Sequence, residues 1–353
     1  MSAAGASENS GTCSVRAAHR FDEAALARWM AEYVEGFRGP LRVEQFRGGQ
    51  SNPTYKVITP SRAYVLRRKP PGQLLKGAHA VEREVRVMCA LERTGFPVAR
   101  VYGQCTDDSV IGTWFYVMEM VEGRIFWDAT LPEIPRARRQ EYFNAMNATI
   151  AALHAVNHEA VGLGDYGKPG NYFARQIGRW SKQYLDDTQA GRDPAMDRLV
   201  EWLPTAIPQS DETSITHGDF RIDNVIFHST EPRVLAVLDW ELSTLGNPLA
   251  DFAYHTMMYH MPPDIVAGLV GADLKALEIP SEEDYVAVYC RRTGRASIAD
   301  YGFYLAFNFF RMAAIFHGIK GRVIRGTASS AQAAERAKAF PRLAEIAWTH
   351  ANT

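Results

Sequence analysis

Three oxygen-bearing side chains suited to phosphoryl chemistry lie in one stretch near the middle of the chain. Asn224 follows Asp219 after four intervening residues, and Asp239 comes later in the same stretch. Transfer of a γ-phosphoryl group needs a carboxylate beside the attacking hydroxyl and hard oxygen ligands for Mg²⁺. Asp219 could orient the hydroxyl and accept its proton, while Asn224 and Asp239 hold the metal. Arg221 could offset charge on the transferring phosphate. These residue types predict a phosphoryl-transfer centre.

Two short apolar runs must position these side chains. Residues 225–227 and 234–238 predict two strands, and the turn residues 229–232 between them predict a hairpin. Because a hairpin returns its second strand beside the start of the first, Asp239 can approach Asn224 and share a metal with it. The alternative is an ordinary hairpin whose Asp and Asn side chains only cap turns.

The wider stretch resembles a known group of enzymes. The spacing of Asp219 and Asn224 matches the kinase pattern H-R-D-x-x-x-x-N, with Gly218 in place of its Arg. The blocks HGDFRIDN and VLDWELSTLGNPLADFAYH resemble the aminoglycoside phosphotransferase and choline kinase superfamily. More narrowly, they are similar to the branch found as kinase-like domains joined to acyl-CoA dehydrogenases and as stand-alone bacterial phosphotransferases. The resemblance extends from about Phe21 onward. It implies an α+β, protein-kinase-like fold with a small antiparallel β-sheet lobe and a mostly helical large lobe, binding ATP and Mg²⁺.

The resemblance also implies roles for residues outside this centre. His217 would brace the catalytic turn. Asp251 would clamp the same turn, although an Asp at a helix start can instead, or also, cap that helix. Adenine would hydrogen-bond to the backbone of Glu119 and Val121, in a hinge at residues 119–123.

Apolar periodicity predicts the elements of both lobes. Strands are expected at residues 41–49, 52–59, 63–69, 98–103 and 114–121. Helices are expected at residues 21–37, 81–92, 135–158, 171–189, 197–203 and 301–319. We therefore predict a disordered tail at 1–20, a nucleotide-binding lobe at 21–122 and a catalytic and substrate lobe at 123–353.

The loop GGQSNP, residues 48–53, lies between the first two strands. Gly and small polar residues let backbone N–H groups approach a phosphate, so Gly49, Gln50 and Ser51 are candidate phosphate contacts. The loop is not G-x-G-x-x-G, and the same residues are also typical of an ordinary hairpin turn.

Arg67 occupies the position of the phosphate-binding Lys in the kinase V-A-I-K strand. An Arg can hold phosphates bidentately, so function could survive this departure. Its partner should be an acid on the next helix, either Glu82 or Glu84, and the resemblance favours Glu84. The alternative is a surface salt bridge of little energetic value.

Composition limits the other possibilities. The chain has 353 residues, a formal net charge of −1 and a pI of about 6.8, which give no overall attraction to nucleic acid or membranes. Its four cysteines form no C-x-x-C pair, and we find no leader and no apolar run long enough to span a membrane. We expect a cytoplasmic monomer or homodimer.

The acceptor is the least determined part of the prediction. The stretch between Cys290 and Gly326 contains seven basic residues and one Asp, which gives it a formal charge of +6. This excess suits an anionic acceptor such as a hydroxyacyl-CoA, although basic runs are also typical of solvated helix faces. Our candidate substrate contacts are Trp240, Glu241 and Arg311. The alternatives are an aminoglycoside phosphotransferase and a nucleotide-binding pseudokinase.

Overall fold

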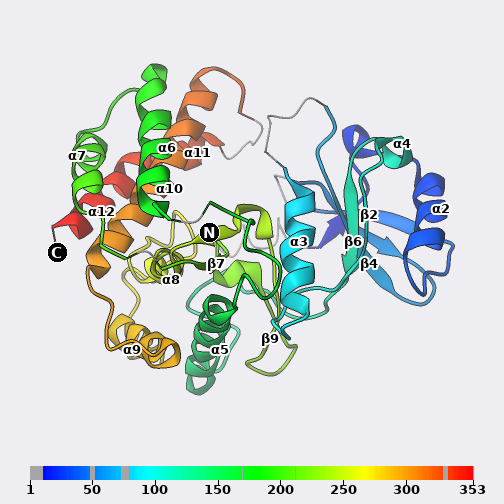
Figure 1. Ribbon diagram of the computed structural model, residues 1–353, viewed down its shortest axis with the longest axis horizontal. Helices are drawn as coiled ribbons and strands as arrows, with labels where there is room; N and C mark the ends of the chain where they lie inside the picture. Colours follow the sequence, from blue (N-terminus) through cyan, green and yellow to red (C-terminus); the bar gives the residue numbers. More distant parts are fainter. Residues whose placement is uncertain are drawn as a thin grey trace. The chain divides into compact units, whose positions relative to one another are not determined.

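The computed structural model describes residues 11–47, 52–72, 79–168, 170–210, 212–328 and 333–352. The chain divides into two compact units (Figure 1). The first comprises residues 1–127, 157–166 and 221–243, and the second comprises residues 128–156, 167–220 and 244–353. The N-terminal stretch of the first unit thus ends near the expected hinge. The unit also includes two later segments, so no single boundary in the sequence separates the two units.

The first unit is built on a six-stranded antiparallel sheet of order β1-β2-β3-β4-β6-β5. Its strands are β1 Thr12–Cys13, β2 Arg42–Phe46, β3 Thr54–Ile58, β4 Ala63–Arg68, β5 Val101–Cys105 and β6 Phe115–Glu119. Its α-helices are α2 Glu23–Tyr33, α3 Val81–Glu92 and α4 Asp108–Ile111. The predicted elements of this region are therefore present, with ends shifted by a few residues.

Side-chain alternation along β4 assigns its two faces to different neighbours. Tyr64 and Leu66 are fully buried in a core with Leu26 and Met30 of α2. Successive strand residues point to opposite faces, so Arg67 projects to the other face, where it meets α3. Figure 1 shows the sheet between α2 and α3. Arg67 thus lies on the side away from the main apolar core.

The predicted disordered tail does not hold for the end nearest the sheet. β1 pairs with β2, with Thr12 opposite Phe46. His19 is fixed by two contacts: its Nδ1 lies 2.8 Å from Gln45 Nε2, and its carbonyl accepts the hydroxyl of Tyr55 at 3.0 Å. The segment contains few apolar residues, but backbone pairing with a sheet edge supplies the order that its composition does not.

The predicted hairpin is present in the first unit. β8 Val225–Phe227 pairs antiparallel with β9 Val234–Val237 and is flanked by the 3₁₀-helices η4 Ile222–Asn224 and η5 Trp240–Leu242. Arg124 and Phe227 exchange two backbone hydrogen bonds of 2.8 Å. A Cβ at Gly123 would lie 2.3 Å from the carbonyl oxygen of Phe227, so this close approach requires glycine.

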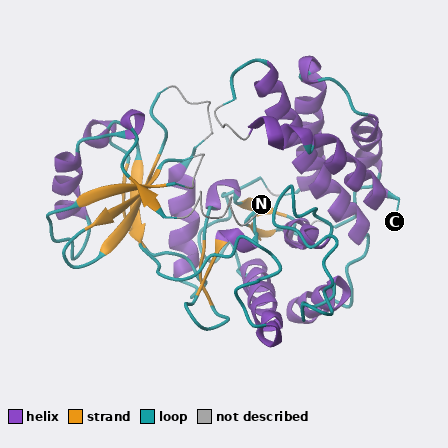
Figure 2. Cartoon of the chain, turned by 180° about the vertical axis from the view of Figure 1, so that it is seen from behind, coloured by secondary structure: helices purple, strands orange, loops and turns teal. Residues whose placement is uncertain are grey.

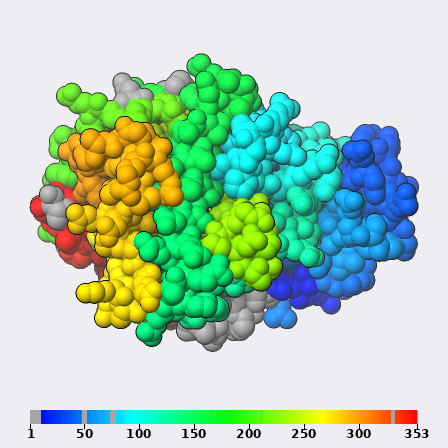
Figure 3. Space-filling model, turned by 90° about the horizontal axis from the view of Figure 1, so that it is seen from below, coloured from blue at the N-terminus to red at the C-terminus, as the bar shows by residue number. Residues whose placement is uncertain are grey.

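The second unit is mainly helical, as Figure 2 shows. Its helices are α5 Arg136–Ala155, α6 Tyr172–Asp186, α7 Pro194–Trp202, α8 Pro248–Thr256, α9 Glu282–Thr293, α10 Tyr301–Ile324, α11 Ala333–Lys338 and α12 Phe340–Ala351. A two-stranded sheet joins β7 Ser214–Thr216 to β10 Thr244–Gly246. α10 is its central element, packing against α6, α8, α11 and α12, and α9 lies against α5 (Figure 3). No helix in the described ranges is both long and apolar enough to cross a membrane.

Candidate active site

Arg67 and Glu84 form a buried ion pair in the first unit. The Nε atom of Arg67 lies 3.0 Å from Glu84 Oε2, and the two side chains are 10% and 2% exposed. The predicted contact is therefore present, and the surface salt bridge alternative is wrong. Glu82 instead pairs with Lys69 at 2.9 Å.

Neutral donors complete the surroundings of Glu84. The hydroxyl of Tyr116, which lies opposite Arg67 in the β4–β6 register, donates to Glu84 Oε2 at 2.9 Å. Asn52 Nδ2 donates to Oε1 at 3.1 Å. Burial raises the pKa of Glu84, and the adjacent Arg67 guanidinium opposes that rise. These donors offset much of the desolvation cost that an isolated buried carboxylate would carry.

The same guanidinium reaches the turn after the hairpin. Arg67 Nη2 donates to Asp239 Oδ1 at 2.7 Å and lies 3.5 Å from Glu241 Oε2. With Glu84, three formal negative charges therefore surround one positive charge. Asp239 has left-handed backbone angles, φ 65° and ψ 63°, which are uncommon outside Gly, Asn and Asp. The turn thus directs the Asp239 carboxylate toward Arg67.

The hairpin brings Asn224 and Asp239 together along the backbone. Val225 pairs with Val237, and the Leu238 N–H donates to the Asn224 carbonyl at 2.8 Å. Asn224 directly precedes Val225, and Asp239 directly follows Leu238. These are the two expected metal ligands. Carboxylate and amide oxygens suit Mg²⁺, and the local excess of negative charge suits a divalent cation. In the described part of the chain, no group of three or more His, Cys, Asp or Glu side chains is arranged for a metal.

Trp240 and Arg221, two residues of the predicted site, have partners within the first unit. Trp240 is 1% exposed, its Nε1 donates to the Val237 carbonyl at 3.0 Å, and its ring packs edge-on against Phe96. The indole therefore anchors η5, and a substrate contact for Trp240 stays a prediction. Arg221 Nη2 donates to Asp223 Oδ2 at 3.0 Å.

The backbone of the expected hinge is used in part by the sheet. The N–H of Glu119 donates to the Arg100 carbonyl at 2.8 Å, so that group belongs to the sheet. Among the described residues, no hydrogen bond involves the backbone N–H of Val121. The predicted phosphate contacts Gly49, Gln50 and Ser51 lie outside the described residues.

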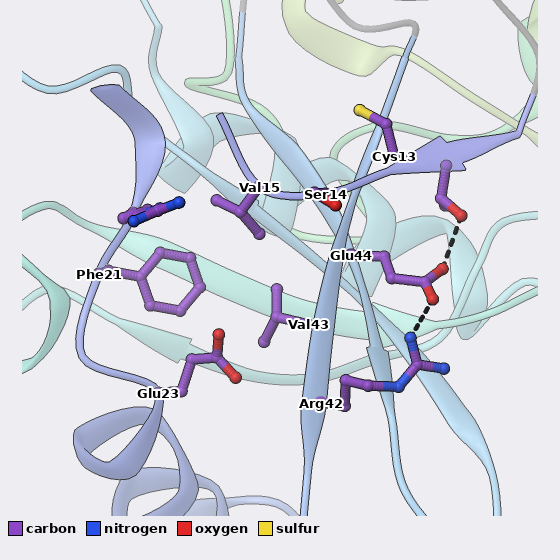
Figure 4. Close-up of a pocket in the computed structure, with 10 residues that line it drawn as sticks. Cys13, Ser14, Val15, Phe21, Glu23, Arg42, Val43 and Glu44 are labelled. Carbon is purple, nitrogen blue, oxygen red and sulfur yellow. Dashed lines mark hydrogen bonds and ion pairs between the residues drawn. The ribbon is translucent and has the colours of Figure 1, made fainter. Parts of the chain in front are cut away.

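A separate cavity of about 530 Å³ lies beside β1 and β2 (Figure 4). Its lining includes Phe21, Val43 and the ion-paired Arg42 and Glu44. None of the residues assigned to phosphoryl transfer lines it.

In the second unit, Asp251 clamps the turn that precedes the expected base. Its Oδ2 accepts the His217 N–H at 2.8 Å and its Oδ1 accepts the Gly218 N–H at 2.7 Å. The cap of α8 is Asn247, whose Oδ1 accepts from two backbone N–H groups. The clamp expected for Asp251 is therefore present, and the capping alternative is wrong. Burial opposes ionisation of Asp251, but hydrogen bonds from His154 and His217 hold its pKa below the usual value.

The expected base is held by a tyrosine that the sequence analysis did not single out. The Tyr254 hydroxyl donates to Asp219 Oδ1 at 2.5 Å. His217 is fully buried, and its Nδ1 accepts the Asp219 N–H at 3.2 Å, which agrees with a bracing role. The spacing of Asp251 and Tyr254, three residues apart on one helix, is the signal that could have identified Tyr254.

Arg311 holds the turn before Asp219. Its Nη2 donates to the Gly218 carbonyl at 2.9 Å, and its guanidinium lies 5.3 Å from the centre of the Tyr254 ring. The residue is 8% exposed. A substrate contact for Arg311 stays a prediction.

Two of the seven basic residues in the stretch pair with acids of the second unit. Arg295 forms a two-pronged ion pair with Glu212, and Arg325 pairs with Asp187 at 2.7 Å. Both acids lie outside the stretch, where the sequence count did not include them. These two pairs lower the net positive charge that the stretch contributes locally.

The two halves of the predicted centre fall in different units. Asp219 belongs to the second unit, while Asn224 and Asp239 belong to the first. Each half is built by its own surroundings, since the contacts described above arise within one unit or the other.

Comparisons with known proteins point to a phosphotransferase family. The model of the phosphotransferase enzyme family matches residues 42–294. Mouse acyl-CoA dehydrogenase family member 10 is 46% identical over 91% of this chain, which spans 31% of that relative. The chain spans between 31% and 44% of the curated relatives first matched.

Solved structures similar to this chain are also phosphotransferases. A candidate aminoglycoside phosphotransferase from Ralstonia eutropha JMP134 is 55% identical, with a TM-score of 0.87 over 94% of this chain and 99% of that one. Spectinomycin phosphotransferase in complex with ADP and spectinomycin is 11% identical, with a TM-score of 0.63 over 95% and 99%. The predicted α+β, protein-kinase-like fold is confirmed.

Proposed function

Because this chain belongs to the phosphotransferase enzyme family, we propose that it transfers the γ-phosphoryl group of ATP to a hydroxyl of a small molecule, with Mg²⁺ as the metal. The observation that carries the proposal is the buried Arg67, paired with Glu84 and directed at Asp239. A cation fixed in this way can contact nucleotide phosphates without losing its own orientation. ADP in the spectinomycin phosphotransferase structure supports an adenine nucleotide as the donor.

Each residue has a defined part in the reaction. Asp219 accepts the proton of the acceptor hydroxyl while the hydroxyl oxygen bonds to the γ-phosphorus. The bond between the γ-phosphorus and the β–γ bridging oxygen breaks, and ADP is released. Asn224 and Asp239 would hold Mg²⁺, which when bound neutralises charge on the phosphates. Arg221 would leave Asp223 to offset charge on the transferring group.

Residues of the hinge and loop would position the nucleotide. The Val121 N–H and the Glu119 carbonyl are the proposed adenine contacts, as the resemblance of the sequence implies. Gly49, Gln50 and Ser51 remain the proposed contacts for the phosphates.

A hydroxyacyl-CoA or related anionic metabolite is our proposed acceptor. The support comes from the acyl-CoA dehydrogenase name of the mouse relative, 46% identical to this chain. Arg295 and Arg325 each pair with an acid of the second unit, so the basic stretch gives less support to an anionic acceptor than its sequence suggests. The second candidate is an aminoglycoside, which the name of the 55% identical Ralstonia protein favours.

The proposal is tested by ADP release from a panel of hydroxylated acids, their CoA esters and aminoglycosides. We expect turnover with one class, loss of at least a thousandfold in Asp219→Asn, and retained Mg²⁺-nucleotide binding in that variant. Asp239→Ala should instead weaken Mg²⁺-nucleotide binding.

The matched control is Asp186→Asn, which removes an exposed carboxylate on α6 that pairs with Lys182. It should behave as wild type. Equal turnover in wild type and Asp219→Asn, or unchanged nucleotide affinity in Asp239→Ala, would contradict the assigned roles. Nucleotide binding without turnover on any acceptor would favour the pseudokinase.

A further inference from the structure

One face of α8 holds both the backbone and the side chain of the turn that contains Asp219. Asp251 accepts the N–H groups of His217 and Gly218, and Tyr254 donates its hydroxyl to Asp219 Oδ1 at 2.5 Å. Residues three apart on a helix share a face. A single rigid element therefore fixes the loop and the proposed base together.

Arg311 of α10 supports the same arrangement from a second helix. Its Nη2 holds the Gly218 carbonyl at 2.9 Å, and its guanidinium lies over the Tyr254 ring. Arg311 and Tyr254 are 8% and 9% exposed, so neither is a mobile surface group. A cation over an aromatic face restrains the ring, and it thereby restrains the direction of the Tyr254 hydroxyl.

We propose that Tyr254 is a positioning residue that sets the orientation of the Asp219 carboxylate. The inference rests on the proposed function, in which Asp219 takes the acceptor proton. A donor fixed on Oδ1 limits rotation of the carboxylate, and orientation of a catalytic group strongly affects rate.

The test is Tyr254→Phe in the full chain, which removes one hydroxyl and keeps the ring beneath Arg311. We expect kcat to fall roughly tenfold to a hundredfold, with KM for ATP within about twofold of wild type. The matched control is Tyr259→Phe. That tyrosine is similarly buried, but its hydroxyl donates to the Pro280 carbonyl instead.

The split between kcat and KM separates positioning from a general structural role. A misoriented base slows the chemical step without weakening nucleotide binding, so kcat should fall while KM for ATP holds in Tyr254→Phe, and both should match wild type in Tyr259→Phe. Thermal unfolding would verify that both variants are folded.

The outcomes also separate this inference from the proposed function. If wild type is active, Asp219→Asn is inactive and Tyr254→Phe has the kcat of wild type, the role of Tyr254 alone is overturned. A rise in KM for ATP as large as the fall in kcat, or an equal fall of kcat in Tyr259→Phe, would overturn it too. Wild type inactive toward every acceptor would overturn both.

Discussion

At the residue scale, Arg67 shows how this chain departs from the kinase pattern and keeps its geometry. A lysine ammonium is one point charge, whereas the planar guanidinium presents five donors. Arg67 uses that shape to contact Glu84, Asp239 and Glu241 at once. The substitution therefore adds contacts to the turn after the hairpin rather than only replacing the lysine.

Arg67→Met should reduce stability as well as activity. Removing the cation leaves Glu84 buried without its charged partner, and breaking such a pair costs about 3 to 5 kcal/mol in the free energy of unfolding. Urea denaturation would measure this loss. The double variant Arg67→Met/Glu84→Gln removes the unpaired charge and should recover part of it. An unfolding midpoint equal to wild type in the single variant would contradict the pairing.

At the element scale, α8 is the helix on which the turn at residues 217–219 depends. Its cap, Asn247, satisfies the helix end, which leaves Asp251 to accept two N–H groups from another segment. A carboxylate suits this position because it has two acceptor oxygens and no donor. The helix thus stabilises a loop that has no regular structure of its own.

Asp251→Asn should weaken this clamp. The amide has a single acceptor oxygen, so one buried N–H of the turn loses its partner, at a cost of about 1 to 3 kcal/mol. Thermal or urea unfolding would detect the loss. The control is Asp193→Asn, because Asp193 caps α7 and Asn serves as well at that position. Similar losses in both variants would contradict a special role for Asp251.

At the scale of the whole molecule, buried histidines link stability to pH. His255 is 2% exposed, and its Nε2 lies 2.7 Å from the Tyr285 hydroxyl. Burial lowers the pKa of His255 to about 4. An unfolded chain has a histidine pKa of about 6.5. Between these values the unfolded state binds a proton that the folded state does not, so acid favours unfolding.

Stability should therefore fall as pH decreases from about 6.5 to about 4, by roughly 1.4 kcal/mol per pH unit for one such histidine. Burial likewise lowers the pKa of His350 to about 4, which adds to the slope. Asp251 acts in a lower window, because its depressed pKa gives stability that is lost only below about pH 4. Urea unfolding across this range measures the slope, and His255→Gln should reduce it. The same slope in the variant and wild type would contradict the prediction.

Local patterns in the sequence determined the elements and most of the chemistry. Strand and helix periods, the hairpin after Asn224 and the pairing of Arg67 with Glu84 depend on neighbours in sequence or on a recognised pattern. These features were predictable because alternation and turn residues act over a few positions.

Only the tertiary structure decided how several polar and aromatic side chains are used. The sequence could not show that Trp240 is buried, that Arg311 holds the Gly218 carbonyl or that Tyr254 holds Asp219. These contacts join residues far apart in the chain, 93 positions in the case of Arg311 and 35 in the case of Tyr254. Charge and apolar character are properties of a residue type, but the partner that satisfies them is fixed by packing. For this reason the candidates for phosphoryl transfer and the supports His217 and Asp251 could be named from a recognised sequence pattern, whereas the contacts of Tyr254 and Arg311 could not.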